Sequence, residues 1–236
     1  MSTESPVVLI TGATGPLGRA AAARFAADGA RVALVGRDRA RLEAQAAETG
    51  LAPDAWMAVE ADASNPSAVP AMVDAVVARF GRIDVLLHLL GGYVGGTPVA
   101  DVDPDELRTM IDRHLWSTFH VVRAVLPGMV ERGFGRIIGV SSTFAATPPA
   151  GLSSYAVAKA AEEVLLRTLA RETAGTGVTA NVVVVRTIDS DHVRETAPTP
   201  KNASWATPEE ITDALVYLAS PASAAVTGVR LPLDGR

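Results

Sequence analysis

The sequence predicts an α/β fold in which a doubly wound parallel sheet of about seven strands is covered by helices on both faces, giving three layers. Three observations support this prediction. Short apolar runs alternate along the chain with longer segments of helical period. A glycine-rich turn separates the first apolar run from the first helical segment, and no linker-like stretch interrupts the 236 residues. We therefore expect a single domain over residues 1–236, in which 189–206 forms a substrate loop or lid.

Strands are expected where short runs of apolar, largely β-branched residues occur. Because helices bury both faces of such a sheet, its strands appear as continuous apolar runs without alternation. We place them near residues 7–11, 31–36, 56–60, 84–90, 136–141, 179–185 and 229–232.

Helices are expected in most of the gaps between the strands, at about 17–28, 38–48, 66–79, 104–130, 154–174 and 208–219. Pro66, Pro104 and Pro208 each follow closely on a small or acidic residue. Proline suits the first turn of a helix, because its φ is already fixed and an N–H has no partner there. We therefore expect three helices to begin close to these prolines, whereas the stretch 189–206 shows no clear period.

The composition excludes several classes of function. A hydrophobic content of 48% supports a large packed core, and the net charge of −5 gives no reason to expect a nucleic-acid partner. No apolar run approaches the roughly 18 residues that span a membrane, and residues 1–5 lack the features of a secretory signal. The absence of cysteine excludes disulfides and thiolate chemistry. We expect a soluble cytoplasmic protein with no membrane partner and no metal site.

The glycine-rich turn Thr11–Gly18 follows an apolar strand and opens a helix. The missing side chains at Gly12, Gly15 and Gly18 let the backbone approach a pyrophosphate, and the N–H groups of the helix N-terminus attract its charge. The pattern predicts a dinucleotide site, to which we also assign Thr14 and Leu17 of the same turn.

The end of the second strand indicates which dinucleotide is bound. Sites for NAD usually present an acidic residue there to the ribose 2′-hydroxyl, whereas a basic residue accommodates the 2′-phosphate of NADP. Gly36 and Arg37 occupy this position, so NADP(H) is favoured over NAD(H). The alternative is that Arg37 is one of several solvated arginines and that Asp38 binds the ribose. After the third strand, Asp62 either accepts a hydrogen bond from the adenine or caps a local turn.

Tyr155 and Lys159 are four residues apart in a helical segment, so their side chains rise from one face on successive turns. An ammonium close to a phenol favours the phenolate and prepares the phenol for proton transfer near neutral pH. Ser142, thirteen residues before Tyr155, ends a strand and can hydrogen-bond a carbonyl oxygen on which negative charge develops, or it simply closes the strand. Ser141 is its rival for the first role. Together these side chains predict an enzyme that acts on a carbonyl group.

These residues resemble the short-chain dehydrogenases/reductases over nearly the whole chain, which implies a Rossmann-type sheet. The resemblance implies that Ser142 orients the carbonyl, that Tyr155 is the acid/base, and that Lys159 binds the nicotinamide ribose. It implies further cofactor contacts from Asp62 and Ala63 at the adenine, Leu90 and Gly91 beside its ribose, and Ile188 and Ser190 near the nicotinamide and phosphates.

Several positions depart from the pattern of this family. Pro16 stands where a glycine is usual, His88-Leu-Leu-Gly91 replaces Asn-Asn-Ala-Gly, and Val185-Arg186 replaces Pro-Gly. His114 takes the place of the helix asparagine that holds a water next to the lysine. We include His114 among the catalytic residues as an imidazole that holds the same water and titrates near neutral pH; the alternative is a satisfied interior histidine. His88 is interpreted as structural.

The segments 91–96, 115–118, 186–190 and 204–205 resemble the dihydropteridine-reductase-like branch of the family. We expect reversible hydride transfer between NADP(H) and a ketone or secondary alcohol, as in a carbonyl reductase. Two alternatives stay open: reduction of a quinonoid or imine substrate, which the branch implies, and a non-catalytic NADP-binding sensor.

Two further expectations concern the substrate pocket and the assembly. Tyr93, Phe144 and Trp205 are expected to line a partly apolar pocket. The helical segments 104–130 and 154–174 carry more apolar residues than one buried face requires. We therefore expect a homo-tetramer, or else a homodimer.

Overall fold

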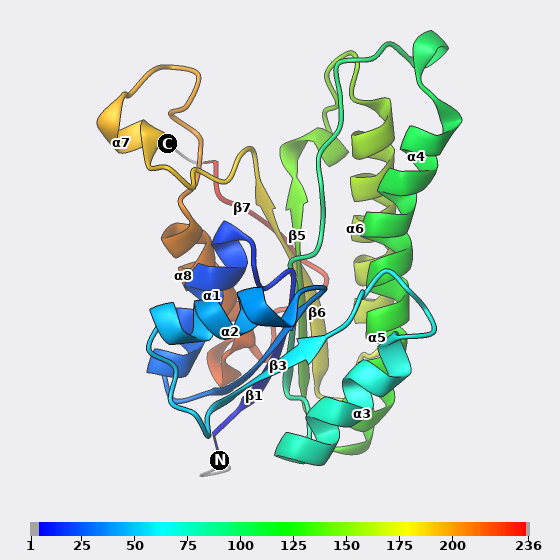
Figure 1. Cartoon of the computed structure of the whole chain (residues 1–236). Helices are drawn as coiled ribbons and strands as arrows, with labels where there is room; N and C mark the ends of the chain where they lie inside the picture. The colour runs from blue at the N-terminus through cyan, green and yellow to red at the C-terminus, as the bar shows by residue number, and fades with distance from the viewer. Residues whose placement is uncertain (1–4, 235–236) are drawn as a thin grey trace.

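The computed structural model describes residues 5–234, and its centre is one parallel sheet in the strand order β3-β2-β1-β4-β5-β6-β7 (Figure 1). The strands are β1 (Val7–Thr11), β2 (Arg31–Gly36), β3 (Trp56–Glu60), β4 (Val85–His88), β5 (Gly135–Ser142), β6 (Val178–Val185) and β7 (Arg230–Pro232). The predicted seven-stranded α/β sheet is confirmed. Residues 1–4, part of the stretch considered for a secretory signal, lie outside the described residues.

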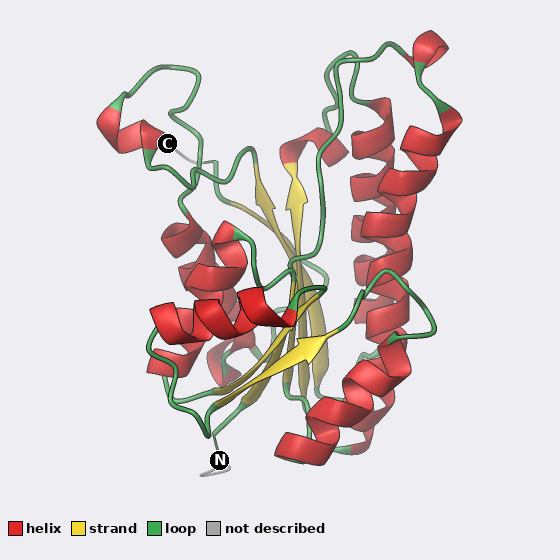
Figure 2. Cartoon of the chain, in the orientation of Figure 1, coloured by secondary structure: helices red, strands yellow, loops and turns green. Residues whose placement is uncertain are grey.

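Helices pack on both faces of the sheet and complete three layers (Figure 2). One layer contains α1 (Pro16–Ala27), α2 (Arg39–Glu48) and α8 (Pro208–Ala219). The other contains α3 (Val69–Phe80), α4 (Pro104–Ile111), α5 (Ser117–Glu131) and α6 (Ser153–Glu172), and the short α7 (Val193–Thr196) lies beyond the sheet. Within residues 5–234, no helix combines the length and the apolar character that crossing a bilayer requires.

Each face of the sheet has its own apolar core. Leu9 and Leu86 point into the core under α3, α5 and α6, whereas their chain neighbours Ile10 and Leu87 point into the core under α1, α2 and α8. The alternation follows from the two-residue period of a strand, and all four side chains are fully buried. Burial on both faces explains why these strands appear as uninterrupted apolar runs.

The order of the strands reverses its direction at β1, which lies between β2 and β4. Val8 pairs with Val32 on one side and with Val85 on the other. The connections that leave the carboxyl ends of β1 and β4 therefore run to opposite faces of the sheet, and such a switch point opens a crevice for a ligand.

The helix expected between the fourth and fifth strands is interrupted by a π turn, Asp112–Trp116, that separates α4 from α5. Two side chains bond to carbonyl groups of this turn: Ser117 Oγ donates to Arg113 O at 2.6 Å, and the Thr118 hydroxyl donates to His114 O. Hydroxyls that bond back to the preceding turn locally change a helix. The spacing of apolar residues carries no information about such hydrogen bonds. The sequence therefore predicts one continuous helix.

Two of the three helix starts predicted from proline are confirmed, at α4 and α8. The third, at Pro66, is wrong, because α3 begins at Val69 and has Pro70 in its first turn. The Asn65 side chain accepts the backbone N–H of Ser67, which closes a turn around Pro66 before the helix begins.

The segment 189–206 is held by polar contacts. The Asp189 carboxylate accepts the backbone N–H groups of Val193 and Arg194 at 2.9 and 2.8 Å, where α7 begins. The Arg194 guanidinium in turn pairs with Glu210 of α8 at 2.7 Å. These contacts tie the segment to α8, and its function as a substrate lid stays a prediction.

Candidate active site

The turn between β1 and α1 forms a tight backbone cradle. Gly12 has a φ of +68°, and a Cβ there would lie 2.7 Å from the backbone of Leu89. A Cβ on Gly18 would lie 2.5 Å from the Gly12 carbonyl oxygen, so α1 packs directly onto the turn. Gly15 is the N-cap of α1 and supplies no side-chain acceptor, which leaves the N–H groups of the first turn available to an anion. The cradle fits the pyrophosphate of a dinucleotide.

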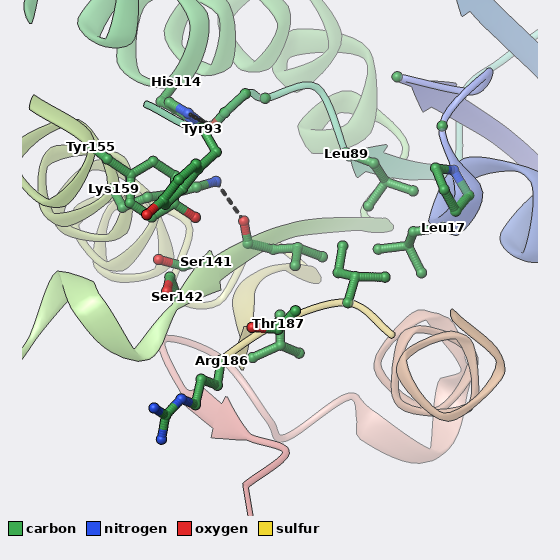
Figure 3. A pocket seen from close by; sticks show the side chains of 18 of the residues that line it. Leu17, Leu89, Tyr93, His114, Ser141, Ser142, Tyr155, Lys159, Arg186 and Thr187 are labelled. Atoms are coloured by element: carbon green, nitrogen blue, oxygen red, sulfur yellow. Dashed lines mark hydrogen bonds between the residues drawn. The ribbon is translucent and has the colours of Figure 1, made fainter. Parts of the chain in front are cut away.

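A cavity of about 680 Å³ lies between this turn and α6 (Figure 3). The predicted site residues that line it are Gly12, Gly15, Leu17, Gly18, Leu90, Gly91, His114, Ser142, Tyr155, Lys159 and Ile188. The predicted cofactor contacts that lie outside its lining are Thr14, Arg37, Asp62, Ala63 and Ser190. The structure therefore brings the proposed reactive groups and the glycine cradle to one cavity.

The carboxyl end of β5 and the first turns of α6 bring the serine, tyrosine and lysine together (Figure 3). Phe144 N donates to Ser142 Oγ at 3.2 Å, which leaves the hydroxyl hydrogen of Ser142 available to a ligand. Ser141 also lines the cavity, and its buried hydroxyl has no hydrogen-bond partner among residues 5–234. Both serines therefore stay candidates for binding a carbonyl oxygen.

Two acceptors hold the ammonium of Lys159. Its Nζ donates to Val140 O at 2.7 Å, the dashed line in Figure 3, and to Glu162 Oε2 at 2.8 Å. Burial raises the pKa of the Glu162 carboxyl, while the Lys159 ammonium acts on it in the opposite direction. The sequence analysis missed Glu162, although an acid three residues after Lys159 lies on the same face of the predicted helix.

His114 lies in the π turn with its ring edge-on to Tyr155, at a centroid distance of 5.7 Å. Its Nε2 donates to Gly92 O at 3.0 Å, so the neutral ring has an unprotonated Nδ1, which finds no hydrogen-bond partner in the described part of the chain. Burial first, and the charge of Lys159 second, lower the pKa of His114 to about 3. The expectation that His114 titrates near neutral pH is wrong. Its function in a water relay stays a prediction.

His88 connects two strands to the π turn. The single hydrogen of Ser117 Oγ is donated to Arg113 O, so Ser117 Oγ accepts a hydrogen bond from His88 Nε2 at 3.0 Å. Because His88 Nε2 carries the proton of the neutral ring, His88 Nδ1 accepts from Thr11 Oγ1 at 3.0 Å. Burial lowers the pKa of His88 to about 3, which keeps the ring neutral. These contacts support its structural interpretation.

The polar groups at the ends of β2 and β3 are engaged to different degrees. Asp38 caps α2 by accepting the Arg41 N–H at 3.1 Å. Asp62 accepts the N–H and the hydroxyl of Ser64 at 3.0 and 2.6 Å, and these hydrogen bonds lower its pKa. Arg37 is exposed, and no hydrogen bond or ion pair within residues 5–234 engages its guanidinium. Of these groups, only Arg37 makes no hydrogen bond or ion pair with its charged group among residues 5–234, although its charge also lowers the pKa of Asp62.

Aromatic side chains from three separate segments line the cavity as predicted: Tyr93, Phe144 and Trp205. Tyr93 packs edge-on against Tyr155, with ring centroids 5.2 Å apart. Arg186 lies at the rim, and in Figure 3 its guanidinium points away from Tyr155. The lining of the cavity is therefore partly aromatic.

Comparison with known proteins places this site in a family. The family model of the short chain dehydrogenases matches residues 6–201. The chain is 35% identical to a hydroxy(phenyl)methylsuccinyl-CoA dehydrogenase subunit of Thauera aromatica, over 99% of this chain and 95% of the relative. It is 32% identical to an NADP-dependent 3-hydroxy acid dehydrogenase of Salmonella typhimurium, over 91% and 89% of the two chains.

The solved structures include a similar fold with a bound cofactor. The 3-ketoacyl-(acyl-carrier-protein) reductase from Brucella melitensis, complexed with NADH, matches with a TM-score of 0.86 and 30% identity, over 99% of this chain and 98% of that chain. Taken with the glycine cradle and the tyrosine and lysine of α6, these matches show that the chain belongs to the short-chain dehydrogenase family, NAD(P)-dependent oxidoreductases that act on alcohol and ketone groups.

Proposed function

We propose that this protein is an NADP(H)-dependent carbonyl reductase that transfers a hydride between NADP(H) and a ketone or secondary alcohol. The observation that carries the proposal is the single cavity lined by Tyr155 and Lys159 on one side and by the glycine cradle on the other. A positioned acid beside a dinucleotide site meets the two requirements of carbonyl reduction, a proton for the oxygen and a hydride donor for the carbon.

Each side chain has a role in this proposal. NADP(H), when bound, supplies the hydride in reduction and accepts it in oxidation. Ser142 donates a hydrogen bond to the carbonyl oxygen, because its hydroxyl hydrogen is not used by Phe144. Tyr155 gives its phenolic proton to the same oxygen, and the Lys159 ammonium stabilises the phenolate that results. Lys159 would also hold the nicotinamide ribose.

The preference for NADP(H) depends on Arg37. Asp38, the alternative ribose ligand, already caps α2, whereas the Arg37 guanidinium is available to a 2′-phosphate. One relative is NADP-dependent and one similar structure contains NADH, so similarity alone supports either cofactor. The proposal therefore depends on the charge at the end of β2.

The test is a substrate panel of ketones, quinonoid compounds and imines, in which the consumption of NADPH is followed by absorbance. On any ketone that is turned over, we expect Tyr155→Phe to lower kcat by roughly 100-fold or more, because general acid catalysis contributes that much. Ser142→Ala is expected to lower kcat by at least about tenfold, because it removes one donor to the developing oxyanion.

Two variants serve as matched controls. Tyr217→Phe makes the same change at an exposed position on α8, and Ser141→Ala makes it at the rival serine. Both are expected to keep the rate of the unchanged protein. A Tyr155→Phe enzyme with full activity would contradict the proposal, and turnover of quinonoid or imine compounds alone would favour that alternative. Tight NADPH binding without any turnover would indicate a sensor.

A further inference from the structure

The ammonium of Lys159 is matched by a buried acid that the proposed mechanism does not use. Lys159 Nζ lies 2.8 Å from Glu162 Oε2, and the two side chains are only 7% and 1% exposed. In a protein interior, opposite charges at this distance cancel much of the field that either one exerts on a third group. The effect of Lys159 on Tyr155 therefore depends on the charge of Glu162.

The other ionisable groups around Glu162 do not replace it. His114 Nδ1 lies 3.8 Å from Glu162 Oε2, and both His114 and His88 are kept neutral because burial lowers the pKa of each to about 3. Glu163, the next residue of α6, is paired with Arg230 of β7 at 2.6 Å. Lys159 and Glu162 are therefore each other's charge partners in this part of the interior.

Arg113 is the remaining cation close to His114. Its Nη1 packs against Gly92, which lies on the loop that follows β4. A Cβ added to Gly92 would lie only 2.9 Å from this nitrogen. Within residues 5–234 it makes no hydrogen bond or ion pair with Glu162. It therefore does not take the place of Lys159 as the partner of this acid.

The surroundings of Glu162 suit both of its protonation states. Lys159 donates to the ionised carboxylate. The Thr118 hydroxyl, 3.4 Å from Glu162 Oε1, donates to His114 O, and the His114 Nε2–H is used by Gly92 O. The Thr118 oxygen therefore presents a lone pair to Glu162 Oε1, and a protonated carboxyl finds an acceptor there. Burial raises the pKa of Glu162, and the charge of Lys159 opposes this effect.

We propose that Glu162 is a positioning residue that, when ionised, offsets the charge of Lys159 and keeps Tyr155 protonated to higher pH. This inference rests on the proposed function, in which Tyr155 gives its proton to the carbonyl oxygen. An uncompensated ammonium favours the phenolate, and a carboxylate next to that ammonium reverses part of the effect. The site then reduces carbonyl groups over a wider pH range and oxidises alcohols mainly at alkaline pH.

The experiment measures kcat/KM against pH in both directions for the full chain and for Glu162→Gln. Glutamine keeps an acceptor for Lys159 and removes the charge. We expect the pH at which alcohol oxidation reaches half of its maximum to fall by about one unit, the usual size of the effect of a nearby charge. Carbonyl reduction is expected to decline at a correspondingly lower pH. Glu162→Leu, which also removes the acceptor, should show the same shift and a higher KM for NADPH.

The control is Glu163→Gln. It removes the negative charge of the next residue of α6, which is paired with Arg230. Its pH profile is expected to match that of the unchanged protein. An unshifted profile in Glu162→Gln, or a shift to higher pH, overturns the inference even when Tyr155→Phe is inactive. Retained activity in Tyr155→Phe would instead overturn the proposed function. Circular dichroism of each variant shows whether it is folded before its profile is interpreted.

Discussion

Arg37 and Asp38 are adjacent in the chain, and only one of them is free to bind a cofactor. The Asp38 carboxylate accepts a backbone N–H at the start of α2, so its position is set by the helix. Arg37 is exposed and uncommitted at the end of β2. We therefore expect the choice between two cofactors that differ by one phosphate to depend on the Arg37 guanidinium.

We expect Arg37→Ala to lower kcat/KM for NADPH by roughly 10- to 100-fold, because a charge-assisted hydrogen bond contributes about 1.5–3 kcal/mol. The value for NADH should hardly change, since NADH has no 2′-phosphate. Arg39→Ala is the control, because Arg39 pairs with Glu43 within α2 at 2.7 Å. Equal losses with both cofactors in Arg37→Ala would show that Arg37 does not recognise the phosphate.

At the scale of single residues, spacing along the chain predicted that the serine, tyrosine and lysine share the cavity, whereas five of the predicted cofactor contacts lie outside its lining. Tyr155 and Lys159 are one helical turn apart, and the strand before them ends at Ser142, so local geometry alone brings them together. The charge state of His114 was not predictable in this way. It depends on burial under the loop after β4, and no pattern within its own helix reports that burial. Glu162 was missed although its spacing of three residues from Lys159 places both side chains on one face of α6.

At the scale of elements, α5 and α6 present apolar side chains to solvent. Val157 and Val164 lie on one face of α6 and are 51% and 52% exposed. Trp116, the last residue of the π turn before α5, is 46% exposed. α6 packs against α4 and the π turn, and α5 continues from that turn in the same layer (Figure 1). Exposed apolar groups on adjacent helices are typical of a surface that another chain covers.

We expect the protein to form a homo-tetramer, or else a homodimer, and Trp116→Glu to shift it to smaller species in light scattering at micromolar concentration. A buried glutamate without a partner strongly disfavours association. Val77→Glu on α3 makes a comparable change at a position that is 41% exposed and should leave the assembly intact. A monomeric unchanged protein, or a Trp116→Glu variant of undiminished size, would contradict this expectation.

Elements with a strong apolar pattern were predictable, and those shaped by hydroxyl groups were not. The seven strands and six long helical segments appear close to their expected positions, because burial on a sheet face requires uninterrupted apolar residues. The π turn depends on side-chain bonds from Ser117 and Thr118, and α7 depends on the buried carboxylate of Asp189. Such contacts leave no period in the sequence.

At the scale of the whole molecule, the two buried histidines make stability depend on pH. Burial lowers the pKa of both His88 and His114 from 6.5 to about 3, so the unfolded chain binds protons that the folded chain does not. Their contribution is fully present above about pH 6.5 and is lost as the pH falls from 6.5 toward 3.

Between pH 7.5 and 5.5 we expect the free energy of unfolding to fall by about 2–3 kcal/mol from these two groups, as measured by urea denaturation. His88→Gln should reduce that fall by about half, because one group remains. His192→Gln is the control, since His192 is exposed beside Glu209 and should leave the pH dependence unchanged. A fall that is the same in all three proteins would show that other groups cause it.

The overall architecture followed from the sequence because strands and helices alternate, and right-handed crossovers between parallel strands leave few ways to connect them. The position of the crevice followed from the same topology, since it lies where the strand order reverses. The width of the cavity and the direction of Arg186 did not follow. Both depend on how separate loops meet, and loops are specified by contacts between distant residues.

The placement of β1 between β2 and β4 also has a consequence for biosynthesis. Val32, the partner of Val8 on one edge, is translated soon after it, but the partner on the other edge is Val85. Translation adds roughly 5–20 residues per second, so the peptide groups on that second edge of β1 stay unpaired for several seconds during synthesis. The half of the molecule that contains the glycine cradle is thus synthesised on the ribosome before the half that contains Tyr155.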